Sequence, residues 1–308
     1  MPLVALVAAT ACWGSAIVTI KIASRGLGAI GVTLIELTAS LLVLGAALLA
    51  RRKPVPRPTR HLVLAGALQP GLAYLLLNAG ISRTSGSHAA LLIGTESVFV
   101  VLLAAVFLNV RPARRTMAGL LCAVAGAALI TDSGSGTATF GGDALVLAGT
   151  LAAASYVIVA HRLAARTDPL VLTSYQFLFG WLITVPVAGA AFLADGRDPF
   201  RGAEPRYVAA AAVAGVLGSA VAFGLYNWAL RQVPATSAGI SLTLIPVFGV
   251  AFAVLLLGEP VSARTIAAGA AVAAGVALTQ QNDGAAPVPQ EQELTVSIAA
   301  DEQPPARE

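Results

Sequence analysis

Apolar residues in this chain are collected into long runs, and polar residues are confined to the segments between them. A run of about 20 apolar residues spans the hydrocarbon core of a bilayer as an α-helix. The pattern predicts ten such helices, at residues 3–22, 28–50, 61–81, 87–108, 113–131, 143–163, 170–194, 207–230, 235–257 and 263–280. The predicted fold class is therefore an all-α integral membrane protein.

An internal repeat relates the two halves of this pattern. A shift of 149 residues places the predicted third to fifth helices on the eighth to tenth without a gap. Asn78 then meets Asn227, and identical residues also meet at Val98-Phe99, Arg115-Thr116 and Gly126. Five helices are an odd number, so the second copy is expected to cross the membrane upside down. Two inverted five-helix repeats give a protein two near-equivalent conformations, open to opposite sides, as secondary transporters require. A duplication that built only a membrane scaffold is the alternative.

The polar segments divide the chain into units. Residues 132–142 are rich in glycine, and residues 281–308 are rich in Pro, Gln, Glu and Ala, a composition typical of disorder. We expect a first repeat at residues 1–131, an outer linker at 132–142, a second repeat at 143–280 and a disordered acidic cytoplasmic tail at 281–308.

Composition excludes a soluble protein. The chain is 57% hydrophobic and 11% charged, with a mean hydropathy of +0.82, whereas soluble domains carry about 25% charged residues. With the N-terminus inside, twelve basic residues fall in cytoplasmic segments and seven in outer ones. The positive-inside rule then places both termini in the cytoplasm and the protein in the cell membrane. Without a platform of basic and aromatic residues, a nucleic-acid partner is not expected.

The sequence gives no sign of an enzyme or a cofactor. Cys12 and Cys122 lie inside apolar runs and resemble small hydrophobic residues more than a disulfide or a metal site. The phosphate-binding pattern Gly-x-x-x-x-Gly-Lys-Ser/Thr does not occur, which argues against ATP-driven transport. His, Asp and Glu do not recur at catalytic or ligand spacing, so we expect no catalytic residue, metal or cofactor.

Short motifs in both halves carry a family resemblance. They are Trp13-Gly14-Ser15 with Lys21, Glu96-Ser97-Val98-Phe99, Ile245-Pro246-Val247-Phe248 and Leu257-Gly258-Glu259-Pro260. In these motifs the chain resembles EamA-type members of the drug/metabolite transporter superfamily, from about residue 3 to residue 280. It departs from the family at Leu108-Asn109-Val110, where Leu-Gly-Glu is usual, and at Ser97, where proline is usual. The resemblance implies a ten-helix secondary carrier that exports amino acids, other metabolites or drugs.

Two carboxylates lie inside predicted helices, where an ionised group costs several kcal/mol unless it is neutralised or paired. Glu96 lies near the midpoint of the fourth predicted helix. It either binds a proton reversibly, as a proton-coupled carrier requires, or forms a permanent hydrogen bond to a neighbouring helix. Glu36 lies nearer an interface in the second predicted helix, where a structural hydrogen bond is expected.

Other polar and aromatic residues are candidates for the cavity. Asn78 and Asn227 either close the cavity alternately at its two ends or bond backbone carbonyls between helices. Tyr74 lies one helical turn from Asn78 on the same face. Trp13, Tyr156 and Gln176 are further candidates within predicted helices.

Three residues near helix ends have simpler expected roles. Lys21 either extends to the lipid headgroups or pairs with a substrate carboxylate. His88 is expected to be solvated or bonded to backbone. Glu259 is expected to make a helix-terminus contact that sets the geometry of the fold.

We therefore predict a secondary active carrier, driven by protons or by the solute's own gradient, that exports small amino-acid-like metabolites or drugs. Its partners are a small-molecule substrate and the lipid bilayer, with protons as the candidate coupling ion, and its small-residue helix faces allow a monomer or a homodimer. The alternatives are a facilitative exchanger or uptake carrier and a membrane receptor or assembly subunit without transport.

The charge distribution predicts a labelling pattern. Single cysteines replace Thr59, Ser135 or Ser297 after Cys12 and Cys122 are removed. Only the Ser135→Cys protein should react with an impermeant maleimide in intact cells, because residue 135 alone lies outside. Reaction at the other two positions instead would invert the topology.

Overall fold

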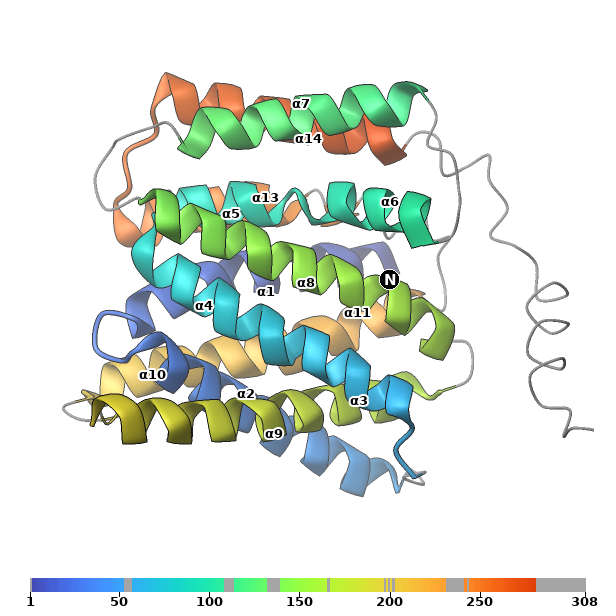
Figure 1. Cartoon of the computed structure of the whole chain (residues 1–308), viewed down its shortest axis with the longest axis vertical. Helices are drawn as coiled ribbons and strands as arrows, with labels where there is room; N and C mark the ends of the chain where they lie inside the picture. The colour runs from blue at the N-terminus through green and yellow to red at the C-terminus, as the bar shows by residue number, and fades with distance from the viewer. Residues whose placement is uncertain are drawn as a thin grey trace, which may run out of the picture.

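The computed structural model describes residues 2–52, 57–107, 114–131, 139–164, 167–196, 198, 200, 203–230, 241–242 and 244–280, and every regular element among them is helical (Figure 1). The first half contains α1 (Pro2–Ala23), α2 (Ala29–Arg51), α3 (Arg60–Gly66), η1 (Ala67–Leu72), α4 (Ala73–Arg83), α5 (Gly86–Ile93), α6 (Glu96–Phe107) and α7 (Arg114–Thr131). The second half contains α8 (Phe140–Ala164), α9 (Pro169–Asp195), α10 (Pro205–Val213), η2 (Ala214–Val221), α11 (Ala222–Leu230), α13 (Leu244–Leu257) and α14 (Ala263–Gln280).

Most predicted apolar runs agree with helices to within a few residues. The first, second, fifth, sixth, seventh and tenth runs correspond to α1, α2, α7, α8, α9 and α14. The ninth predicted run, 235–257, is described from residue 241 onward and contains α13. The tail and most of the predicted linker lie outside the described residues.

Three predicted runs are interrupted. The third contains the π-helical segment η1, where Pro70 has no N–H to donate and Gln69 leaves the helical region at φ −144° and ψ 122°. The eighth contains a second π-helical segment, η2, without a proline. The fourth was predicted as one helix, and this was wrong, because α5 ends at Ile93 and α6 begins at Glu96. Between them, both the backbone N–H (3.1 Å) and the hydroxyl (2.6 Å) of Thr95 bond the carbonyl of Leu92.

Six helical stretches of the described residues are long and apolar enough to cross a membrane. They are Pro2–Ala23, Ala29–Arg51, Arg60–Arg83, Phe140–Val159, Pro169–Ala194 and Pro205–Tyr226. Large apolar side chains are exposed along several helices, for example Leu42 (70%) on α2, Phe107 (68%) on α6 and Leu193 (84%) on α9. Such surfaces suit a lipid environment, and the chain is a multi-pass membrane protein by these properties.

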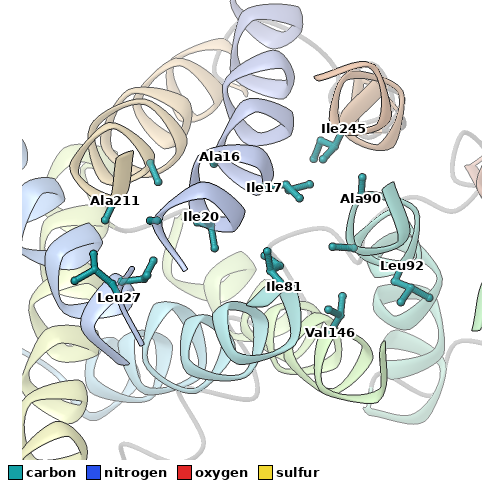
Figure 2. Packing of buried hydrophobic residues seen from close by; sticks show 14 residues of the cluster. Ala16, Ile17, Ile20, Leu27, Ile81, Ala90, Leu92, Val146, Ala211 and Ile245 are labelled. Atoms are coloured by element: carbon teal, nitrogen blue, oxygen red, sulfur yellow. The ribbon is translucent and has the colours of Figure 1, made fainter. Parts of the chain in front are cut away.

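The helices form a bundle with a paired layer at each edge. The pair α7 and α14 packs together at one edge, and α2 packs against α9 at the other (Figure 1). Helix α1 lies among the remaining helices and contacts α13, α11, η2 and α10. Figure 2 shows the main core cluster, in which Ile17 and Ile20 of α1 face Ile81 of α4, Ala90 of α5 and Ile245 of α13.

Contacts between helices from the two halves recur in reciprocal pairs. Helix α4 packs against α8, and η2 and α11 pack against α1. In the same way α5 and α6 contact α8, and α13 contacts α1. Segment η1 contacts α9, and η2 contacts α2. Each of these three contacts therefore has a counterpart when the first five predicted helices are exchanged for the second five.

The close approach of η2 to α2 predicts that alanine substitutions at two glycines differ in their effect on stability. A Cβ at Gly215 of η2 would lie 2.2 Å from the backbone oxygen of Glu36, whereas a Cβ at Gly224 of α11 would meet nothing within 4 Å. Gly215→Ala should destabilise the protein by about 1–3 kcal/mol, since a backbone atom cannot yield without separating the helices. Gly224→Ala should be neutral or stabilising, because alanine is the better helix former. Thermal unfolding in detergent measures both, and equal melting temperatures would contradict the close packing.

Candidate functional site

A buried polar cluster lies where α2, α4 and η2 meet, and we call it the Glu36 cluster. Asn78 Nδ2 donates to Glu36 Oε2 and to Thr33 Oγ1, at 2.9 Å each. Ser219 Oγ donates to Glu36 Oε1 at 3.3 Å, and Tyr74 OH lies 2.9 Å from Ser219 Oγ. The single hydroxyl proton of Ser219 is used on Glu36, so Tyr74 is the donor in this last bond.

The local sequence explains how the Glu36 cluster assembles. Tyr74 and Asn78 are four residues apart on α4 and share one face. Gly215 lets the backbone of η2 approach α2 closely at Glu36. One turn along α2, Ser40 Oγ donates to the carbonyls of Glu36 (2.7 Å) and Gly215 (3.0 Å). This close contact brings Ser219 within reach of the carboxylate.

The Glu36 cluster is enclosed. Glu36 is 2% exposed, Asn78 is 1% exposed and Ser219 is fully buried. Both carboxylate oxygens accept hydrogen bonds, which offsets part of the cost of removing the group from water. Glu36 thus forms a hydrogen bond to a neighbouring helix, as the sequence predicts. Its partner is Asn78, which was expected either to bond backbone carbonyls or to close the cavity.

Glu96 occupies a different environment. It is the first residue of α6, directly after the interruption that follows α5, and its side chain is partly exposed. It lies close enough to Tyr156 of α8 and Tyr226 of α11 to interact with them electrostatically. Two helices of the second half therefore supply phenol groups near this carboxylate of the first half.

A series of aromatic rings links the two carboxylate regions. Tyr74 is 6.1 Å from Phe177, Phe177 is 5.7 Å from Phe223, and Phe223 is 5.3 Å from Trp13, all in edge-to-face geometry. Trp13 also contacts Tyr226 at 5.3 Å. Trp13 and Tyr226 are partly exposed, whereas Phe177 is fully buried. The series therefore runs from Tyr74 in the Glu36 cluster to Tyr226, which interacts electrostatically with Glu96.

Tyr156 and Gln176 form a buried pair. Tyr156 OH donates to Gln176 Oε1 at 2.8 Å, which links α8 to α9. Gln176 is 1% exposed, and its Nε2 has no hydrogen-bond partner among the described residues. The backbone oxygen of Gln176 would lie 2.6 Å from a Cβ at Gly66, so α3 packs tightly over this position.

The expectation that Lys21 extends to the lipid headgroups was wrong. Its Nζ donates instead to the carbonyls of Ile81 (3.1 Å), Ser82 (3.3 Å) and Thr84. These carbonyls lie at the C-terminal end of α4, where helical hydrogen bonding leaves acceptors unpaired and a cation is favoured. Lys21 therefore fastens α1 to the end of α4.

The expectation for Glu259 is confirmed. Its carboxylate accepts from the backbone N–H of Gly86 (2.7 Å) and Ser87 (2.9 Å), and from the Ser87 hydroxyl (2.8 Å). It thus caps the first turn of α5 from the end of α13. For His88 the expectation was wrong, since its side chain is buried beside Asp143. The side chain of Asn227 lies outside the described part of the structure.

Sequence reasoning missed Thr33, Ser219 and Asp143 as partners. Ser and Thr are frequent in membrane helices, where they usually bond the carbonyl four residues earlier, so their occurrence alone carries little information. Asp143, at the start of a predicted span, was a usable signal, because an acidic residue there needs a partner. Among the described residues, no three His, Cys, Asp or Glu side chains come together to hold a metal.

The apolar helices, the interhelical polar clusters and the paired edge layers together define a polytopic membrane protein with buried carboxylates. Residues 1–132 and 140–280 both match the EamA-like transporter family. The chain belongs to this family of membrane transporters, whose substrates are small molecules.

Relatives with assigned names are transporters. A "Probable terminal-alkyne amino-acid exporter" of Streptantibioticus cattleyicolor is 32% identical over 277 residues, which cover 89% of this chain and 91% of the relative. An "Uncharacterized transporter" of Archaeoglobus fulgidus is 28% identical over 231 residues, 74% of this chain and 78% of the relative. A solved crystal structure shares the fold at a TM-score of 0.62 and 19% identity, covering 88% of this chain and 95% of that one.

The Glu36 cluster predicts strong coupling between two substitutions. Asn78→Ala should destabilise the protein by about 1–3 kcal/mol, because it leaves a buried carboxylate without one of its donors. Glu36→Gln replaces that acceptor with a neutral amide. In the double variant the loss should be smaller than the sum of the single losses. Chemical unfolding of the four proteins in one detergent measures the coupling, and strict additivity would show that the two side chains do not interact.

Proposed function

We propose that this protein is a secondary active carrier that exports small amino-acid-like metabolites or amphipathic drugs by alternating access. Its two halves, residues 1–131 and 143–280, act as inverted five-helix repeats of one ten-helix bundle. The protein lies in the cell membrane with both termini in the cytoplasm. The following observations support these assignments.

The repeat is supported by sequence register and helix contacts together. The shift of 149 residues maps η1, residues 67–72, onto residues 216–221, which lie within η2. A π-helical segment is rare, so its recurrence at matching positions favours a shared origin of the two halves. The reciprocal contacts of α4 with α8 and of η2 with α1 agree with a two-fold relation. Two such halves are the usual basis of alternating access.

The environment of Glu96 is the single observation that carries the function. A partly exposed carboxylate stands at a helix interruption, near enough to Tyr156 and Tyr226 to interact with them electrostatically, and Tyr226 packs against Trp13. A carboxylate beside aromatic rings attracts an ammonium group, through its charge and through cation–π attraction. The neighbouring rings offer an apolar surface for the rest of the solute. An amine with a compact apolar part, as in an amino acid, fits both features.

One relative supports export as the direction of transport. The S. cattleyicolor relative is named an amino-acid exporter, and export of an amino-acid-like solute is the corresponding proposal for this chain. Glu96 supplies the proposed coupling, because its carboxylate binds either a proton or the solute amine. Facilitative exchange or uptake, driven by the solute gradient alone, is the alternative within transport.

Paired flux measurements test the role of Glu96. The full chain is reconstituted in proteoliposomes, and labelled amino acids with apolar side chains, including a terminal-alkyne amino acid, are first screened by counterflow. With an active solute, wild type should concentrate it under an imposed pH gradient. Glu96→Gln keeps the shape of the neutral acid but cannot release a proton. This variant should therefore lose concentrative transport. Counterflow, which needs no proton release, should persist, with a weaker apparent affinity because the solute ammonium group loses its carboxylate partner.

Glu36→Gln is the matched control. Its carboxylate is enclosed and hydrogen-bonded at both oxygens, so this variant should lose stability more than coupling. If Glu96→Gln concentrates solute as well as wild type does, Glu96 is not the coupling site. If wild type itself shows saturable counterflow but no response to the gradient, the facilitative alternative holds.

A further inference from the structure

A second titratable group of residues lies at the end of the bundle where α4 turns into α5. His88 Nδ1 of α5 lies 3.5 Å from Asp143 Oδ2 of α8, and the two side chains are 6% and 1% exposed. The hydroxyl of Thr84 donates to the other oxygen of Asp143. We call these three residues the His88 cluster.

The His88 cluster joins helices that are far apart in the chain. Helix α5 follows the α4 turn, whereas α8 opens the second half. The carbonyl of Thr84 also accepts from Lys21 of α1. A Cβ at Gly80 would meet the backbone N of Val146 at 2.7 Å, so α4 and α8 are in tight contact at this end. Any opening of this end that moves α5 away from α8 must separate His88 from Asp143.

The contact between His88 and Asp143 is incomplete as a hydrogen bond. Asp143 receives one bond from Thr84, but Nδ1 of His88 has no hydrogen-bond partner among the described residues. A distance of 3.5 Å is long for a hydrogen bond but within the range of an ion pair. The strength of this contact therefore depends on whether the imidazole carries a second proton.

Other charged groups around this end are already engaged or exposed. Lys21 is held by carbonyls, and Glu259 by the first turn of α5. Arg83 of α4 bonds the carbonyl of Ala79 at 3.4 Å. Glu96 of α6, which also packs against α8, interacts with Tyr156. The other described charged side chains on elements that contact α5 or α8 are partly or fully exposed: Arg25, Arg60, His61, Arg114, Arg115, Asp168 and Arg264.

We propose that the His88–Asp143 pair is a proton-binding site that holds this end of the bundle closed. With His88 protonated and Asp143 ionised, the pair attracts α5 to α8 and opening is disfavoured. When His88 loses its proton, the charge attraction is lost and the end opens more often. Imidazole side chains change charge between mildly acidic and mildly alkaline pH, so opening should increase over that range. The inference rests on the proposed function only in assuming that this end opens.

Cysteine labelling of the full chain in nanodiscs tests the site without any transported solute. Ala89, next to His88 and fully buried, is replaced by cysteine after Cys12 and Cys122 are removed. The rate at which a maleimide labels this cysteine is divided, at each pH, by the labelling rate of Val261→Cys. Val261 is exposed (45%) and lies at the same end of the bundle, two residues after Glu259. The division removes the intrinsic pH dependence of the thiol. The ratio should rise about fivefold from pH 5.5 to pH 8, the lower end of typical coupling between sites.

Two variants and one control assign the effect. His88→Gln should abolish the rise, and Asp143→Asn, which keeps an acceptor for Thr84, should abolish it as well. His61→Gln is the matched control, because His61 is an exposed histidine at the start of α3, and it should retain the rise. A rise that survives in either cluster variant, or a ratio that is flat in the parent protein, overturns the proposal. Solute counterflow by the same proteins in proteoliposomes reports separately on the proposed function.

Discussion

The carboxylate of Glu36 can lie in the interior of this bundle only because neighbouring helices supply its hydrogen-bond donors. Asn78 of α4 and Ser219 of η2 each satisfy one oxygen, and a buried acceptor without them would cost more than a single bond is worth. This requirement fixes α2, α4 and η2 in register with one another. The aromatic contacts that begin at Tyr74 extend this packing to Phe177, Phe223 and Trp13.

The sequence predicts the helices well because one physical length governs them. Runs that must span a bilayer are about 20 residues long whatever their detail, and six such stretches occur in the described part of the chain. The interruptions are harder to foresee. Pro70 signals η1 directly, whereas η2 has no proline and the break before Glu96 depends on how Thr95 bonds Leu92. Propensity alone does not distinguish these turns from regular helix.

The candidate site was predictable only in part, for a related reason. Spacing places Tyr74 and Asn78 on one face of a helix, and the structure brings both to Glu36 and Ser219. Which helix presents its acceptor to that face is decided by packing, notably by the approach of Gly215 to α2. Lys21 shows the same limit. From the sequence alone, a lysine at the end of a helix can interact with lipid headgroups, a substrate or another helix end, and only the structure shows which carbonyls lie near its Nζ.

The two π-helical segments have a mechanical consequence. A helix bends most readily where its regular hydrogen-bond ladder is already interrupted. Here the interruptions, of 6 and 8 residues, occur once in each half and at matching positions. Each half therefore contains a short π-helical segment at which it can bend, and the helical stretches on either side of that segment can move as rigid bodies. The enclosed Glu36 cluster touches η2 directly, so bending there would strain the bonds of a buried carboxylate.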